Sequence, residues 1–165
     1  METVYNFING KQVPSRGTKA HPIYNPATGE QIRQVIMSTP DDVNEAVEVA
    51  HKAFADWSAT SPLRRARIMF KFKELLERDW DSLARLIVEE HGKVYSDACG
   101  ELTRGLEVVE FSFGIPHLLK GEFSEQAGRG IDIHSSLQPL GVTVGITPFN
   151  FPAMVPMWMF PIALA

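Results

Sequence analysis

Short alternations of apolar and polar residues between positions 3 and 36 predict strands joined by turns. Asn9 and Gly10 separate two such runs, and both residue types tolerate the positive φ that a two-residue hairpin turn requires. A second turn cluster, Asn25–Glu30, precedes the alternating run Ile32–Ile36. We therefore expect the chain to begin with small β elements.

A helical period replaces this pattern at Thr39 and predicts four successive helices. Thr39 and Pro40 are the residue types of an N-cap and a first helical position. Ser61–Pro62 opens the second helix, Gly92 ends the third, and the fourth covers about 96–113. The apolar positions expected on the inner faces are Val43, Ala46, Val47, Ala50, Phe54 and Trp57 in the first helix, Ile68, Met69, Phe72, Leu75 and Leu76 in the second, and Ala98, Leu102, Val109 and Phe113 in the fourth.

The remaining residues read as strand, strand, loop and helix. Ile131–Leu137 is expected to be a strand, and the almost wholly apolar Leu140–Ile146 is typical of a strand buried on both faces of a parallel sheet. Thr147–Pro152 then forms a loop before a final apolar run that begins a helix. Because α/β sheets bind ligands beyond the carboxyl ends of their strands, this loop is the expected binding region.

Composition narrows the class of protein. The chain has 165 residues, with 16 Lys and Arg against 20 Asp and Glu, so its net charge is −4. Its 44% of hydrophobic residues is typical of a soluble globular protein. The acidic balance disfavours nucleic-acid binding, and the single cysteine excludes an internal disulfide. Residues 152–165 contain prolines and fall short of the ~20 residues that span a membrane. We expect a cytoplasmic protein, not bound to a membrane, and expect the apolar end to mark a chain cut within a domain.

Few side chains have the spacing of known catalytic centres. The five histidines lack metal-ligand spacing, so no metal site is expected. Cys99 lies beside Ala98 on a helix and is interpreted as a small core residue. The basic cluster Arg64–Arg67 is followed by acidic residues and is interpreted as a solvated face or a subunit contact.

Arg104 and Asn150 each allow two interpretations. Arg104 has Glu101 and Glu107 three residues away on either side, as in a surface ion pair. Alternatively, the neighbouring Gly105 leaves room for a carboxylate held by two parallel hydrogen bonds. Asn150, between two prolines and two aromatic residues, either caps the following helix or offers its amide as a fixed donor to a developing oxyanion.

The segment Gly145–Pro152, with sequence GITPFNFP, resembles the aldehyde dehydrogenase superfamily. Phe7–Gly10, Asn25–Glu30 and the pair Gly92-Lys93 match the N-terminal pattern of the same superfamily, so the resemblance covers almost the whole chain. The resemblance extends to one branch, the CoA-acylating methylmalonate-semialdehyde dehydrogenases. It is carried there by Phe149 in place of a common Trp, Gly100–Gly105 and Met154–Pro161.

The resemblance implies an NAD-dependent oxidation of a semialdehyde acid through an enzyme thioester, with loss of CO₂ and transfer of the acyl group to coenzyme A as propionyl-CoA or acetyl-CoA. The catalytic cysteine, the general-base glutamate and the residues that choose between NAD and NADP are expected beyond residue 165, and Cys99 does not match the nucleophile. The 165-residue chain alone is therefore expected to be inactive. By position, the resemblance assigns Asn150 to the oxyanion, Thr147, Pro148 and Phe149 to the cofactor, Phe151 and Trp158 to the substrate tunnel, and Arg104 to the substrate carboxylate.

The resemblance also implies an α/β fold in three parts. These are the N-terminal part of a coenzyme-binding domain (1–120), a β arm that bridges subunits of a homo-oligomer (121–139), and the first β–loop–α unit of a Rossmann-like parallel sheet (140–165). Another NAD(P)-dependent aldehyde dehydrogenase, or a non-catalytic chain that only binds a partner, are the alternatives. A reading frame that continues past Ala165 would favour an enzyme.

Overall fold

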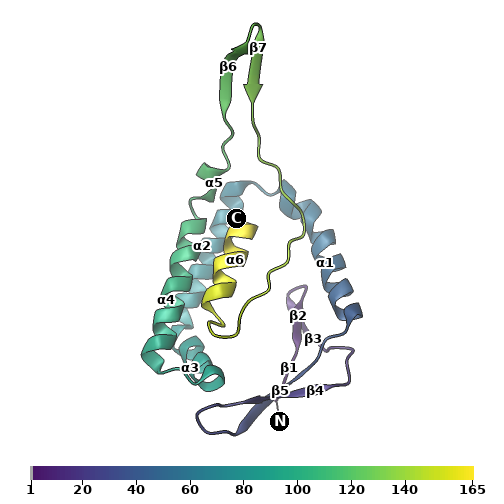
Figure 1. Ribbon diagram of the computed structural model, residues 1–165, viewed down its shortest axis with the longest axis vertical. Coiled ribbons are helices and arrows are strands. Elements are labelled where there is room, and N and C mark those ends of the chain that lie inside the picture. Colours follow the sequence, from purple (N-terminus) through teal and green to yellow (C-terminus); the bar gives the residue numbers. More distant parts are fainter. Residues whose placement is uncertain (1) are drawn as a thin grey trace.

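The N-terminal strands form a small sheet and a separate hairpin in the computed structural model, which describes residues 2–165 (Figure 1). The three-stranded sheet has the order β1-β5-β4, with β1 parallel and β4 antiparallel to β5. The hairpin turns at Asn9 (φ 54°) and Gly10 (φ 73°), which confirms the two-residue turn. The strands are β1 (Glu2–Val4), β2 (Asn6–Ile8), β3 (Lys11–Val13), β4 (Ala20–Tyr24) and β5 (Gln31–Ile36).

The four expected helices are present, and the fourth lies one residue earlier at each end than the expected 96–113. Thr39 caps the first helix in a reciprocal capping box with Asp42, whose buried carboxylate also accepts from Ser15 Oγ at 2.9 Å. Gly92 ends the third helix in the left-handed conformation, with φ at 79°. The helices are α1 (Pro40–Ala59), α2 (Pro62–Arg78), α3 (Trp80–His91) and α4 (Tyr95–Ser112), followed by the short α5 (Ile115–Leu118).

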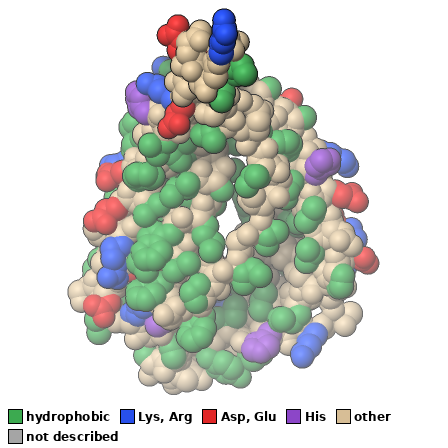
Figure 2. All heavy atoms as spheres, turned by 45° about the horizontal axis from the view of Figure 1, so that its top comes forward, with side chains coloured by type: hydrophobic (Ala, Val, Ile, Leu, Met, Phe, Trp, Pro, Cys, Tyr) green, Lys and Arg blue, Asp and Glu red, His purple; other side chains and the backbone are tan. Residues whose placement is uncertain are grey.

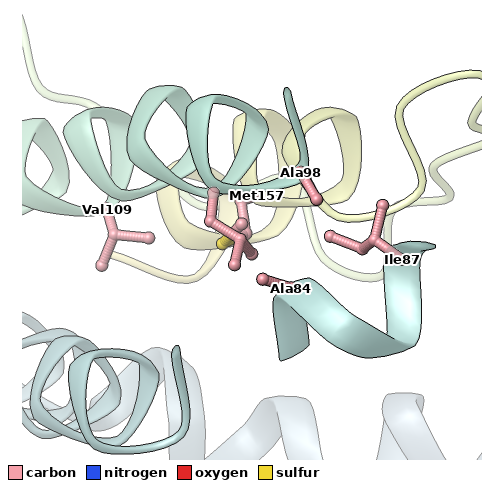
Figure 3. Packing of buried hydrophobic residues seen from close by; sticks show 6 residues of the cluster. Ala84, Ile87, Ala98, Val109 and Met157 are labelled. Carbon is pink, nitrogen blue, oxygen red and sulfur yellow. The ribbon is translucent and has the colours of Figure 1, made fainter. Parts of the chain in front are cut away.

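The core lies between α3, α4 and α6 (Met154–Leu164), which confirms the apolar stripe of α4 at Ala98, Leu102 and Val109. Figure 3 shows Ala98 of α4 opposite Ile87 of α3, with Met157 of α6 packed into the same cluster. Phe113 is only half-buried. The core is therefore helical, and residues 154–164 belong to it.

Two of the expected inner faces are only partly buried. In α2 Met69 is buried and Phe72 and Leu76 pack against the core, while Ile68 and Leu75 are exposed. In α1 no apolar residue is buried, and Val43 is 57% exposed. The stripe of α1 faces a cavity of about 440 Å³ that it shares with β2 and residues 142–145. Figure 2 shows this face, with hydrophobic side chains on both sides of a hollow.

The arm and the segment after it differ from one another. β6 (Phe123–Gly128) and β7 (Ile131–His134) form an antiparallel hairpin that projects from the helices (Figure 1), although β7 ends three residues before the expected Leu137. The strand expected over Leu140–Ile146 is wrong: the segment forms no strand, and Leu140 is 94% exposed. The physical reason is that no strand among residues 2–165 pairs with it, and a strand is stable only with a hydrogen-bonded neighbour.

Among the helices within residues 2–165, none combines the length and hydropathy needed to cross a membrane.

Candidate active site

Helix α4 presents Arg104 on its surface without an ionic partner. Within residues 2–165 no hydrogen bond or ion pair is formed by the Arg104 guanidinium, so the interpretation as a surface pair with Glu101 or Glu107 is wrong. Glu101 is unavailable because it points into the protein, where it is fully buried. The expected room beside Gly105 is also absent. Gly105 is buried, and a Cβ there would clash with Met157 of α6.

The buried Glu101 connects α4 to Lys93 and to the first turn of α6. Its Oε2 lies 2.5 Å from Lys93 Nζ, while its Oε1 accepts the backbone N–H groups of Ala153 at 2.8 Å and Met154 at 3.1 Å. Burial works against the charged carboxylate, but the Lys93 ammonium and the two N–H donors outweigh it, so the pKa of Glu101 lies below its ordinary value. Glu101 is therefore ionised at neutral pH.

Asn150 does not cap the final helix. The N-cap residue of α6 is Ala153, no side chain of the preceding loop bonds to the helix, and Glu101 takes the two N–H groups instead. Asn150 is exposed, and its amide forms no hydrogen bond within residues 2–165. The capping interpretation is therefore wrong. The amide is free to donate to a ligand.

Phe151, the residue after Asn150, lies close to two cations. Lys93 Nζ is 4.0 Å from the centroid of the Phe151 ring, and Arg104 Cζ is 5.6 Å from it. Trp158 Nε1 donates to the backbone oxygen of Arg104 at 3.3 Å, which joins α6 to the same turn of α4. Arg104, Phe151 and Trp158 are thus brought together, with Asn150 adjacent.

The three residues expected at the cofactor directly precede Asn150 on the same loop. Thr147, Pro148 and Phe149 are exposed in the segment that leads to α6, and Phe149 is 87% exposed. No side-chain hydrogen bond or ring contact within residues 2–165 links these residues to Arg104 or Asn150. Their side chains are therefore open to a ligand on the exposed side of the loop.

The other chemically active side chains form no second centre. No three metal-binding side chains are grouped in the part of the chain that the structure describes. Cys99 is half-buried and packs against the core of α3, α4 and α6, as its interpretation as a core residue expected.

Sequence reasoning missed the roles of Glu101 and Lys93. The sequence places Lys93 in the family motif Gly92-Lys93 and offers Glu101 as a partner for Arg104, but it predicts no pair between Lys93 and Glu101. A signal was present, because Glu101 interrupts the stripe of α4 directly before Leu102, at the spacing of a core-facing position. A charged residue on such a face requires a buried partner.

These features define an α/β segment in which a loop with a free amide meets a helix with an unpaired guanidinium. The family model for the aldehyde dehydrogenase family matches residues 13–165. The chain therefore belongs to the aldehyde dehydrogenase family. This confirms the family resemblance and, with it, the α/β fold expected for the N-terminal part of such an enzyme.

Individual relatives agree with this assignment. The chain is 47% identical over its whole length to a malonate-semialdehyde dehydrogenase of Pseudomonas aeruginosa, of which it covers 33%. Among solved structures, the methylmalonate-semialdehyde dehydrogenase of Oceanimonas doudoroffii superposes with a TM-score of 0.95 at 52% identity, covering 99% of this chain and 33% of that one. A protein from Sinorhizobium meliloti 1021 complexed with NAD gives 0.94 at 50% identity, covering 98% and 33%. The chain spans about a third of the length of these relatives.

Proposed function

We propose that this chain is the N-terminal third of an NAD-dependent, CoA-acylating dehydrogenase of malonate or methylmalonate semialdehyde. The family, the names of two relatives at about 50% identity and the NAD complex of a third support this proposal. Coenzyme A, as acyl acceptor, follows from the branch resemblance. The same resemblance leads us to propose a cytoplasmic homo-oligomer joined through 121–139, where Phe123, Ile131 and Ile133 are exposed.

The loop residues suit the roles that the family implies. Asn150 donates its free amide to the oxyanion that forms when the aldehyde carbonyl is attacked. Pro148 and Phe149 offer an exposed apolar surface beside Thr147 on which a planar cofactor ring can lie. These residues would hold NAD, which would supply a hydride acceptor for the adduct formed when the aldehyde is attacked. Phe151 and Trp158 supply apolar walls next to Arg104.

One observation carries the choice of substrate class. The Arg104 guanidinium is unpaired and lies over the ring of Phe151, the residue that follows Asn150. A semialdehyde acid has a carboxylate and an aldehyde separated by a short chain, so it needs a cation and an oxyanion donor close together. A guanidinium can bind the carboxylate through two parallel hydrogen bonds.

The test is substrate discrimination by Arg104→Leu in the full-length protein, meaning the complete product of the reading frame that contains these residues. We expect kcat/KM for malonate semialdehyde to fall ~10- to 100-fold more than for propanal, because a hydrogen bond to a charged group contributes ~1.5–3 kcal/mol. Arg104→Lys should recover part of the loss. Arg67→Leu, at another exposed arginine, is the matched control. It should leave kcat/KM for both aldehydes unchanged. Equal losses for both aldehydes would contradict the role of Arg104.

A further inference from the structure

Helix α6 begins without a cap of its own, and Glu101 supplies one from a different helix. The N-cap residue is Ala153, and the N–H groups of Ala153 and Met154 both donate to Glu101 Oε1, at 2.8 and 3.1 Å. These residues lie three and four positions after Asn150. The loop that carries the candidate oxyanion donor is therefore attached to α4 at its C-terminal end.

Lys93 makes a second attachment at the same place. It follows Gly92, which ends α3, and it pairs with Glu101 Oε2 at 2.5 Å while its ammonium lies 4.0 Å from the centroid of the Phe151 ring. The Lys93 side chain is only 12% exposed, and that of Glu101 is fully buried. Exposed ion pairs of this protein, such as Lys71 with Glu74, have no such surroundings.

The location of this pair gives it a consequence for the site. Glu101 and Arg104 are three residues apart on α4, so one rigid turn carries both the anchor of the loop and the candidate carboxylate ligand. Trp158 holds α6 to that turn through the backbone oxygen of Arg104. The Asn150 loop is therefore joined to the turn of Arg104 through Glu101, beside the contact that Trp158 makes.

We propose that Glu101, with Lys93 as its counter-ion, is a positioning residue that holds the 147–152 loop at the distance from Arg104 that the reaction requires. The oxyanion role of Asn150 under the proposed function is the premise of this inference. Buried ion pairs can commonly be replaced by apolar residues of similar volume without loss of stability, so stability alone does not require this pair. The hydrogen bonds to two backbone N–H groups are directional, and an apolar replacement cannot reproduce them.

Two double variants of the full-length protein test whether Glu101 positions the 147–152 loop or only stabilises the fold. Lys93→Met with Glu101→Met removes the charges and the acceptor together, whereas Lys93→Met with Glu101→Gln removes the charges but keeps an amide oxygen for the two N–H groups. The exposed pair Lys71→Met with Glu74→Gln is the matched control. The measurements are kcat and KM with propanal, a neutral aldehyde that does not need Arg104, normalised to active sites, together with amide exchange at residues 153–157.

The first double variant should lose ~10- to 100-fold in kcat, because small displacements of a reacting group cost up to about two orders of magnitude, while the KM for NAD stays within about twofold. Its amides at Ala153 and Met154 should exchange faster. The second double variant should recover kcat to within about threefold of wild type, and the control should not change. Equal kcat values in the two double variants, or unchanged amide exchange in the first, would overturn the proposal.

This outcome is distinguishable from failure of the proposed function. If the wild-type protein oxidised propanal but did not favour semialdehyde acids, the substrate assignment would fail while the comparison of the two double variants still decided the role of Glu101. If it oxidised neither aldehyde, the proposed function would fail, and amide exchange at Ala153 and Met154 would decide whether Glu101 holds the loop.

Discussion

The two sides of this molecule both contain apolar segments, but these segments have different surroundings. On one side α3, α4 and α6 bury Leu102, Val109 and Met157 in a shared core. On the other side α1 and residues 142–145 border an open cavity, where the side chains of Val43, Val47 and Val144 are exposed. Figure 1 shows the extended segment running between these two sides before it reaches α6.

The difference teaches that an apolar pattern identifies residues that can be buried, but burial requires a neighbouring element. α4 is buried against α6, whereas Leu140–Ile146 has no paired strand within residues 2–165. The candidate ligand-binding residues lie at the border between the two sides, on the loop that ends the open segment. Substitutions on the packed side should therefore alter stability, and those on the loop should alter activity.

The largest expected effect is on the loop. Asn150→Ala in the full-length protein should slow hydride transfer to NAD ~10²- to 10³-fold, or about 3–4 kcal/mol, because it removes one oxyanion donor. NAD affinity and the melting temperature should stay as in wild type, since the amide has no partner in residues 2–165. Single-turnover kinetics with calorimetry measure both quantities. An unchanged rate of hydride transfer would contradict the role of Asn150 as an oxyanion donor.

The second prediction compares leucines on the two sides. Leu102→Ala should lower the free energy of unfolding by about 2–5 kcal/mol, because Leu102 is only 2% exposed in the core. Leu140→Ala, at a residue 94% exposed, should cost under about 0.5 kcal/mol in the 165-residue chain. Urea denaturation measures both. A cost for Leu140→Ala that rises above about 2 kcal/mol in the full-length protein would show that the open side is covered there.

Two glycines of α4 sharpen the contrast within the packed side. Gly105→Ala should lower the free energy of unfolding by a net ~1–2 kcal/mol, because the new Cβ meets Met157 and overpacking outweighs the gain in helix propensity. Gly100→Ala meets nothing within 4 Å and should instead raise it by up to about 1 kcal/mol. Thermal denaturation of both variants is the measurement. If both substitutions raised the free energy of unfolding, the close contact between Gly105 of α4 and Met157 of α6 would be contradicted.

The last prediction concerns the pH dependence of the α1 cap on the open side. Hydrogen bonds from the Thr39 backbone N–H, then from Arg16 and Ser15, lower the pKa of Asp42 from 3.8 to about 2. A depressed pKa stabilises the folded state above the unfolded value and loses that effect as the pH falls through the folded value. The advantage of wild type over Asp42→Asn should therefore be complete above pH ~4 and vanish toward pH ~2. Urea midpoints across this range measure it, and a pH-independent difference would contradict it.

Local features were readable from the sequence because they depend on neighbouring residues. The turn at Asn9 and Gly10, the cap at Thr39 and the helix end at Gly92 each follow from backbone preferences within a few positions. The motif around Asn150 likewise identified the family before any contact was known, as the match over residues 13–165 confirms.

Only the tertiary structure decided which apolar faces are buried and which charges pair. Glu101 pairs with Lys93 and caps α6 across 52 positions of the chain, leaving Arg104 unpaired, although Glu101 and Arg104 are neighbours on one helix. Leu140–Ile146 has the composition of a buried strand and remains exposed. The physical reason is that local preference acts through adjacent residues, whereas burial and ion pairing depend on partners that the fold brings from elsewhere in the chain.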